Sequence, residues 1–575
     1  MSVVGWAQIG LLALLIGLLV RPLGGYLARV YTGERTVLQP ILGPIERALY
    51  RLAGVDVSAE QKWSEYAVAL IFFHAIGVVA LYLLLRIQVL LPINPQFPSE
   101  TSPDLALDTA VSFVTNTSWQ SYSGETTLTY LAQMTGIAVQ SFLSAAAGMA
   151  VAVALIRGFA RRTTGTIGNF WVDLTRGTFY VLLPICMIAA LFFVEEGVPQ
   201  TLGGYVQAET VDAGRQLIAR GPVASQEAIK LLSGDGGGFF NVNSAHPFEN
   251  PTPLTNLVEM GLILMLGAAL TNTFGRMVGS ERQGWVLLAT MAILFGLGVV
   301  GLYALEARGN PALTVVAVDQ APGPLQPGGN MEGKEVRFGI AASALYAEAS
   351  TASSDGAVDA MHDSFLPLSG AILLANMMVD EVIIGAPGSG LWGMLLFALV
   401  TVFIAGLMIG RTPEFIGKKI EAREIKMAML ALLVAPALIL GLTALASVIP
   451  AGLAGPGNSG PHGFSEILYA YTSAAATNGS AFAGLSANTT FYNLTLALAM
   501  FAGRFFVIVP VLAIAGSLAA KRSVPLSAGT LRTDGLQFVL LLAGTILIVG
   551  ALGFLPALSL GPLVEHFAMQ AGVTY

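Results

Sequence analysis

The chain has 575 residues, of which 55% are hydrophobic and 11% are charged, and its net charge at pH 7 is −7. A mean hydropathy of +0.72 argues against a soluble chain of two to four domains and indicates a polytopic membrane protein. The small negative charge offers no basic surface for nucleic acid, and the single Cys186 excludes an intramolecular disulfide.

Ten apolar runs approach the length of about 17 to 25 residues that crosses a bilayer. In chain order they are Trp6–Val20, Tyr66–Leu85, Met134–Ile156, Gly177–Val194, Leu257–Phe274, Trp285–Leu305, Leu391–Ile409, Met427–Ile449, Leu494–Ala519 and Phe538–Leu555. No positive charge precedes the first run and Arg21 follows it, which is typical of a membrane anchor rather than of a signal peptide. We therefore predict an external N-terminus.

The distribution of lysine and arginine supports this orientation. With ten crossings, both termini are predicted to be external and five segments between the runs to face the cytoplasm. These segments hold 20 of the 28 Lys and Arg residues, and they are Arg21–Lys62, Arg157–Arg176, Arg276–Arg282, Arg411–Lys426 and Lys521–Arg532. An excess of positive charge on the cytoplasmic side is the usual arrangement in membrane proteins.

Four short polar loops recur on the predicted external side. They are Asn116-Thr117-Ser118, Gly234-Asp235-Gly236, Ser354-Asp355-Gly356 and Thr477-Asn478-Gly479, and steps of 118, 120 and 123 positions separate their third residues. Any one of them could be an ordinary external turn, because Asn-Gly and Asp-Gly are turn dipeptides. Four loops in phase instead predict four copies of one helix–pore loop–helix unit around a central pore.

A short semi-apolar segment precedes each loop, and none is long enough to span a membrane. The segments are Leu105–Phe113, Gln226–Leu232, Arg337–Ala349 and Ser465–Ala475. We interpret each as a re-entrant pore helix followed by an extended loop, which is tolerated at membrane depth where it lines a cavity or is buried in protein. Four such loops on one axis would form a ring of carbonyl oxygens that replaces the water around a monovalent cation.

Three stretches resemble a known family: Phe239–Pro251 (FFNVNSAHPFENP), Gly410–Glu414 with Gly417–Lys419, and Asn478–Thr489 (NGSAFAGLSANT). From the first apolar run to the last, the chain resembles the potassium-binding A subunit of the Kdp-type potassium-transporting ATPase. The resemblance implies an all-α polytopic fold of four pseudo-symmetric repeats, related to potassium channels and Trk-type transporters, with one extra helix at each end. The corresponding boundaries are 1–62, 63–162, 163–283, 284–425, 426–522 and 523–575.

The resemblance also implies a transport role. K⁺ is then the transported ion, the twelve residues of the four loops form its filter, and neither an organic cofactor nor a transition metal is expected. The implied partners are a P-type ATPase catalytic subunit, small accessory membrane subunits and the lipid of the bacterial cytoplasmic (inner) membrane. ATP is hydrolysed on the catalytic subunit and not on this chain.

The chain itself has neither a Walker A pattern nor the Asp-Lys-Thr-Gly-Thr phosphorylation motif of P-type pumps. No predicted cytoplasmic segment is large enough for a nucleotide domain, so ATP-driven transport requires a partner. The alternative is a self-sufficient channel or ion-coupled symporter of the Trk class, which has the same repeat geometry. Potassium flux through the purified chain alone distinguishes the two.

Two loops depart from the family pattern. The second has Gly234-Asp235-Gly236 where Thr-Asn-Gly is common, and the third has Asp355 where a small neutral residue, often Cys, is usual. The carboxylates either point behind the filter into hydrogen bonds or face the ion. Facing the ion, they would strengthen cation binding and weaken the discrimination against sodium.

Arg504 lies within the ninth apolar run, where a charge is expensive and is usually functional or paired. By resemblance to the four-repeat superfamily, it faces the pore below the filter and acts as an electrostatic barrier to leak. The alternative is a salt bridge to a buried acid such as Glu259. The histidines His74, His246 and His362 have no partners at metal-ligand spacing, so we expect structural hydrogen bonds from them.

The third repeat is too long for one crossing. From Ala357 to Ile409 there are 53 residues, which as a single helix would run about 80 Å. A glycine-rich segment predicts a break and a gating site, at Gly385, Gly388 and Gly390. The alternative is an external hairpin with Phe365–Ile384 as an eleventh crossing, which conflicts with the basic segment that follows.

Overall fold

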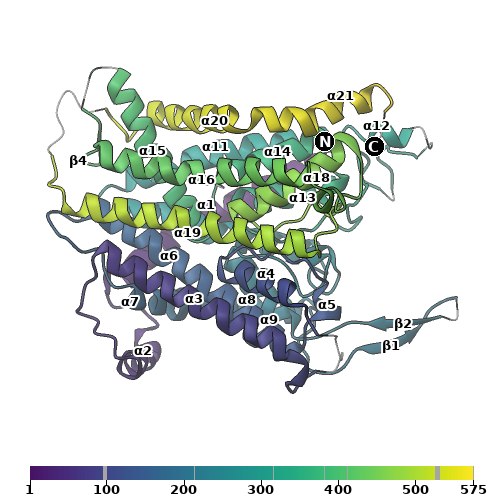
Figure 1. Cartoon of the computed structure of the whole chain (residues 1–575), viewed down its shortest axis with the longest axis horizontal. Helices are drawn as coiled ribbons and strands as arrows, with labels where there is room; N and C mark the ends of the chain where they lie inside the picture. The colour runs from purple at the N-terminus through teal and green to yellow at the C-terminus, as the bar shows by residue number, and fades with distance from the viewer. Residues whose placement is uncertain are drawn as a thin grey trace.

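The computed structural model of the chain describes residues 1–94, 100–212, 214–314, 316, 318–324, 326–380, 382–408, 410, 412–524 and 531–573. All ten predicted crossings correspond to helices, or series of helices, that are long and apolar enough to span a membrane. In Figure 1 they run side by side, and the chain enters and leaves the bundle at the same end. Ile409, at the end of the seventh predicted run, and Arg411, in the predicted basic segment, lie outside the described residues.

The first two units have the predicted order of long helix, short helix, loop and second long helix. The first contains α3 (Trp63–Ile87), η1 (Gln88–Leu90), α4 (Pro103–Val114), α5 (Gly124–Thr127), η2 (Ala132–Ile137) and α6 (Ala138–Ala160). The second contains α7 (Phe170–Arg176), η3 (Gly177–Leu182), α8 (Leu183–Glu195), β1 (Val206–Glu209), β2 (Arg215–Ile218), α9 (Val223–Leu232), η4 (Asn243–Ala245) and α10 (Pro253–Met277). The antiparallel strands β1 and β2 form a hairpin that extends beyond the bundle (Figure 1).

The other two units and the chain ends complete the bundle. The third unit contains α11 (Glu281–Glu306), α12 (Pro311–Thr314), α13 (Gly339–Ser353), η5 (His362–Ser364), α14 (Pro367–Met378) and α15 (Ser389–Met408), followed by the antiparallel pair β3 (Glu414–Phe415) and β4 (Lys418–Lys419). The fourth contains α16 (Ala422–Ala446), α17 (Pro450–Leu453), α18 (Gly460–Ala476) and α19 (Thr490–Ala520). The ends are α1 (Val3–Thr32), α2 (Gln39–Ala53), α20 (Leu536–Leu558), η6 (Ser559–Leu563) and α21 (Val564–Gln570). The six boundaries predicted between these parts stay predictions.

The second long helix of each unit lies inside the bundle. In α6, α10, α15 and α19, 67% to 78% of the most apolar window is buried, whereas the other six crossings bury 22% to 39%. Among these inner helices, α6 contacts the other three. Small residues allow the close approach: a Cβ atom at Gly158 of α6 would lie 2.7 Å from the Ala515 carbonyl oxygen of α19. The inner helices therefore form the core that positions the four loops.

The third unit breaks where the glycines predict. The helix α14 has 12 residues, which span about 18 Å and cannot cross a bilayer. It ends at Met378 and α15 begins at Ser389, so Gly385 and Gly388 lie in non-helical backbone and Gly390 lies in the first turn of α15. The broken helix is confirmed, and the alternative with an eleventh crossing is wrong.

Ion pairs of His462 connect α18 with the C-terminal helix α21. Nε2 of His462 in α18 lies 2.9 Å from Asp363 Oδ1, and Nδ1 lies 2.7 Å from Glu565 Oε1 of α21. Burial lowers the pKa of His462, but the hydrogen bonds to Asp363 and Glu565 outweigh burial and raise this pKa to about 10. A carboxyl oxygen of Glu466 lies within 4.8 Å of ligand atoms of both Asp363 and His462.

We expect the stabilising effect of His462 to disappear in alkaline solution. Because the folded protein raises the pKa from 6.5 to about 10, the contribution is fully present below pH 6.5 and is lost as the pH rises through about 10. The measurement compares the Tm of the wild type and of His462→Gln in detergent across this range. The difference in Tm should shrink with rising pH, and a difference independent of pH would contradict the ion pair.

Candidate functional site

The four predicted loops share one backbone conformation at their first residue. Asn116, Gly234, Ser354 and Thr477 have φ angles of 61°, 58°, 62° and 61°, in the left-handed region that residues other than glycine seldom adopt. Each closely follows the end of a short helix, namely α4, α9, α13 or α18. These helices lie in the half of the bundle nearest the chain ends (Figure 1). The left-handed residue ends the helix and redirects the chain, identically in all four units.

Hydrogen bonds join the first three loops. The Asn116 side chain donates from Nδ2 to the Gly234 carbonyl oxygen at 2.9 Å. The Asp235 carbonyl oxygen accepts from the Gly356 amide at 3.0 Å and from the Ser118 hydroxyl at 2.5 Å. Loops that are more than a hundred residues apart in the sequence therefore meet at one place.

Glycines allow the loops to approach one another closely. Gly479 packs directly against the Thr117 carbonyl oxygen, and Gly236 packs against the Gly356 amide. A Cβ atom at Gly356 would lie 2.9 Å from the Asn478 carbonyl oxygen. Any side chain at these three glycines would occupy the space between the loops, which explains the residue type at these positions.

A cavity of about 820 Å³ lies against the loops. Its lining includes Ser118, Gly356 and Gly479, the third residues of three loops, and Gly237, which directly follows the second loop. The structure brings all twelve predicted loop residues together, and every one of them is buried. The cavity therefore ends on the loops.

The predicted break lies against the same loops through their first residues. A Cβ atom at Gly234 would lie 2.6 Å from the Cβ atom of Ala386, and the Ser354 hydroxyl lies 3.3 Å from that of Ser389. Three of the four third residues line the cavity. Gly234, the first residue of the second loop, contacts the break, and Ser354, the first residue of the third, lies beside the start of α15. The second and third loops therefore lie between the cavity and the segment 382–388.

Two glycines of the inner helices make room for the break. A Cβ atom at Gly148 of α6 would lie 2.8 Å from the Pro387 carbonyl oxygen, and Gly267 of α10 packs against the Gly385 carbonyl oxygen. Gly388, which has a φ angle of 116°, packs against the Gly148 carbonyl oxygen. The sequence alone does not distinguish Gly148 or Gly267 from other glycines, because glycine is common in apolar crossings.

Arg504 of α19 lies beside the break. Its guanidinium lies 5.4 Å from the Trp392 ring, and Nη2 lies 3.3 Å from the place of a Cβ atom at Gly148. Glu259, the alternative partner, instead lies 2.9 Å from the Tyr346 hydroxyl. The role of Arg504 as a barrier below the filter stays a prediction.

The chain is similar to known potassium-transport proteins over nearly its whole length. The family model described as "Potassium-transporting ATPase A subunit" matches residues 10–567. The chain belongs to this family. Curated relatives named "Potassium-transporting ATPase potassium-binding subunit" include that of Methylobacterium nodulans, 62% identical over 100% of this chain and 99% of the relative, and that of Granulibacter bethesdensis, 60% identical over 100% of both.

The fold of this A subunit also has a solved counterpart. The potassium transporter TrkH from Vibrio parahaemolyticus matches with a TM-score of 0.52 at 13% identity, covering 78% of this chain and 84% of that chain. At this level of identity the likeness shows the fold alone. The predicted relation to Trk-type transporters is confirmed as a structural one.

Both carboxyl groups that depart from the family pattern are buried in this A subunit. Asp355 Oδ1 accepts a hydrogen bond from the Ala357 amide at 2.9 Å, so this side chain is turned onto its own loop. Asp235 lies beside the Ser141 side chain of α6. The contact of Asp355 favours the interpretation in which this carboxyl group points into a hydrogen bond behind the filter. Neither carboxyl oxygen of Asp235 has a hydrogen-bond partner among the described residues, so its predicted orientation stays a prediction.

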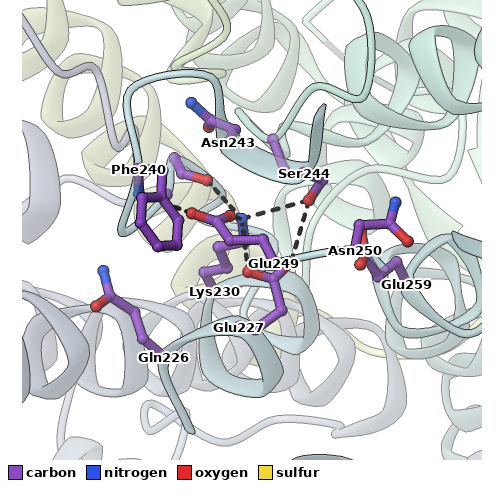
Figure 2. Close-up of polar contacts among 12 residues, drawn as sticks. Gln226, Glu227, Lys230, Phe240, Asn243, Ser244, Glu249, Asn250 and Glu259 are labelled. Carbon is purple, nitrogen blue, oxygen red and sulfur yellow. Dashed lines mark hydrogen bonds and ion pairs between the residues drawn. The ribbon is translucent and has the colours of Figure 1, made fainter. Parts of the chain in front are cut away.

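A buried lysine, not predicted as part of the site, supports the end of the second loop. Lys230 of α9 donates from Nζ to the Gly237 carbonyl oxygen at 2.9 Å. The ammonium lies 2.9 Å from Glu227 Oε2 and also pairs with Glu249. Figure 2 shows these groups gathered around Nζ, with the Ser244 hydroxyl at 3.4 Å. Lys230 therefore fixes the position of the Gly237 carbonyl oxygen, directly after the second loop.

The same cluster anchors the stretch that carries the family resemblance. Glu249 Oε1 accepts a hydrogen bond from the Phe240 amide at 2.8 Å, and Ser244 donates to Glu227 Oε1 at 3.0 Å. The sequence signal that could have identified this cluster is a lysine near the end of a re-entrant helix, since a charge at membrane depth needs partners.

The three histidines make structural hydrogen bonds, as expected. The hydrogen-bond distances are 2.8 Å for His74, 3.0 Å for His246 and 2.9 Å for His362.

We expect Lys230→Met to weaken potassium binding as well as stability. Loss of the ammonium leaves buried carboxylates without a partner, which costs about 3–5 kcal/mol, and releases the Gly237 carbonyl. The measurement is the Tm of the purified A subunit titrated with KCl against NaCl, which gives the stability and the apparent K⁺ affinity together. Both should fall in this variant.

Two variants separate positioning from general destabilisation. Arg157 pairs with the buried Asp173 at 2.6 Å and lies 13 residues beyond Ser144, the α6 residue that contacts Asn116, or about 20 Å along the helix. Arg157→Met should lower the Tm, but its K⁺ affinity should equal that of the wild type. The double variant Lys230→Met/Glu249→Gln should regain stability without regaining affinity. Full recovery of both would mean that Lys230 only neutralises charge.

Proposed function

We propose that this chain is the potassium-binding and potassium-selecting, channel-like subunit of an ATP-driven, high-affinity K⁺ uptake complex. External K⁺ binds among the four loops and passes to a P-type ATPase catalytic subunit, which hydrolyses ATP. Small accessory subunits complete the complex in the bacterial cytoplasmic membrane. Family membership and the names of the relatives support this assignment. In this role K⁺ is the cargo, and the chain uses no organic cofactor.

One observation supports the ion site above all others. Four loops with the same left-handed first residue converge at the inner end of a cavity of about 820 Å³. Hydrated K⁺ entering the cavity would exchange water for loop carbonyl oxygens. The close contacts of Gly356 with the Asn478 carbonyl oxygen and of Gly479 with the Thr117 carbonyl oxygen support loops that act together on one ion.

The proposed direction of transport follows from the orientation of the chain. The four short helices lie toward the end of the bundle where the chain begins (Figure 1), and 20 of the 28 basic residues belong to segments predicted at the other end. By the positive-inside rule, both chain ends and the cavity then face outward. The filter is reached first by external ions.

The break in the third unit supplies the proposed gate. The segment 382–388 lies against Gly234 and the inner helices, where it would obstruct ions that have passed the loops. The permanent charge of Arg504 lies beside it and would repel cations in a low-dielectric surrounding. Together they would keep the subunit closed to free diffusion until the ion moves toward the catalytic partner.

The second candidate is a self-sufficient Trk-like channel or ion-coupled symporter, which the structural likeness to a potassium transporter favours. To separate the candidates, the tagged chain is purified from its native membrane and tested for a copurifying ATPase and for K⁺ flux in liposomes. We expect K⁺-stimulated ATP hydrolysis in the copurified complex and little flux through the chain alone. Rapid K⁺ flux through the chain alone, without a copurifying ATPase, would favour the Trk-like function.

We expect Arg504→Ala to increase the uncoupled K⁺ leak severalfold, because it removes the proposed barrier beside the gate. The measurement is ⁸⁶Rb⁺ efflux from liposomes that contain the complex without ATP. Arg504→Lys keeps the charge and should stay close to the wild type. An unchanged leak in a correctly assembled Arg504→Ala complex would remove Arg504 from the barrier.

A further inference from the structure

The helix α2 presents an apolar ridge away from the rest of the protein. Ile41, Ile45 and Leu52, spaced four and seven residues apart, share one face and are 70%, 46% and 87% exposed. Gly43 and Tyr50, on the opposite face, are buried. An apolar ridge on a short helix that packs by its other face is typical of a helix lying on a membrane surface.

Polar contacts fix the depth of α2 in the membrane. Glu46 pairs with Arg176 at 3.3 Å and accepts a hydrogen bond from the Tyr180 hydroxyl at 2.7 Å. Arg176 directly precedes the predicted fourth apolar run, Gly177–Val194, and Tyr180 is the fourth residue of that run. The helix is therefore held beside the end of a crossing and not in the water beyond it. Figure 1 shows α2 at the edge of the bundle.

The exposed charge of α2 is positive. Arg47 and Arg51 are exposed along the helix, and Arg35 is exposed just before it. Glu46 is the only acidic residue of α2, and Arg176 already pairs with it. In the orientation proposed above, this surface faces the cytoplasmic leaflet, whose anionic headgroups attract basic residues.

We propose that α2 lies in the cytoplasmic surface of the membrane and binds anionic phospholipid. The ridge of Ile41, Ile45 and Leu52 enters the boundary between headgroups and acyl chains, and Arg47 and Arg51 bind headgroup phosphates. Lipid is the occupant because the contacts of Glu46 place the ridge at that depth. The inference goes beyond ion transport and uses only the orientation from the proposed function, so a failure to bind lipid leaves the filter untouched.

Fluorescence quenching tests the depth. In a Cys186→Ala background, Ile45→Cys is labelled with an environment-sensitive dye, and the chain is placed in nanodiscs containing phosphatidylcholine brominated on its acyl chains. The control is Val211→Cys beyond β1, where Val211 is 105% exposed. We expect severalfold stronger quenching at position 45 than at position 211. Equal quenching, or quenching at position 45 that is lost in the assembled complex, would overturn the proposal, since a protein partner would then cover the ridge.

Lipid preference tests the charge. Phosphatidylglycerol should raise the Tm of the wild type more than phosphatidylcholine does. Arg47→Gln/Arg51→Gln should lower the apparent affinity for phosphatidylglycerol by about 30-fold, or about fivefold for each arginine, as expected for ~1 kcal/mol per basic residue near an anionic surface. The control Arg215→Gln/Arg308→Gln changes two exposed arginines on the predicted external side. An unchanged lipid preference in Arg47→Gln/Arg51→Gln would overturn the proposal.

Discussion

Backbone groups that leave a helix at membrane depth must find partners within the protein, because hydrocarbon offers none. The loops of this chain meet that requirement largely through one another. Asn116 and Gly356 donate to carbonyls of the second loop, and Asn478 of the fourth loop donates to the Ser350 carbonyl of α13 at 3.0 Å. Each loop therefore depends on its neighbours, and the long helices serve to hold the four short helices where these contacts form.

The second loop receives support from three directions. Asn116 of the first loop donates a hydrogen bond to Gly234, Lys230 holds the carbonyl of Gly237, and Ala386 of the break packs against Gly234. A buried ion pair is costly compared with apolar packing, so the Lys230 cluster is not explained by stability. Its position directly behind the filter is explained if the carbonyls must be kept in place.

Local patterns were sufficient for the helices and for the break, and insufficient for the contacts that support them. Apolar runs set by bilayer thickness predicted the ten crossings, and Gly385 and Gly388 predicted the break. The partnership of Gly148 with Pro387 and that of His462 with Glu565 join residues more than a hundred positions apart. A single sequence carries no signal for such a pair. The regular spacing of the four polar loops predicted their location, and the likeness to a known family implied that they form a filter, but neither pointed to Lys230.

The loops also explain how four copies of one unit can differ in sequence and keep one geometry. Their first residues are asparagine, glycine, serine and threonine, yet their φ angles lie between 58° and 62°. A left-handed conformation costs a residue other than glycine roughly 1–2 kcal/mol. Asn116, Ser354 and Thr477 therefore have backbone strain that a glycine at the same position would not have. Strain of this kind persists where the surroundings fix the backbone. If carbonyls bind the ion, selection acts on backbone geometry, and the side chains remain free to serve as links such as that of Asn116.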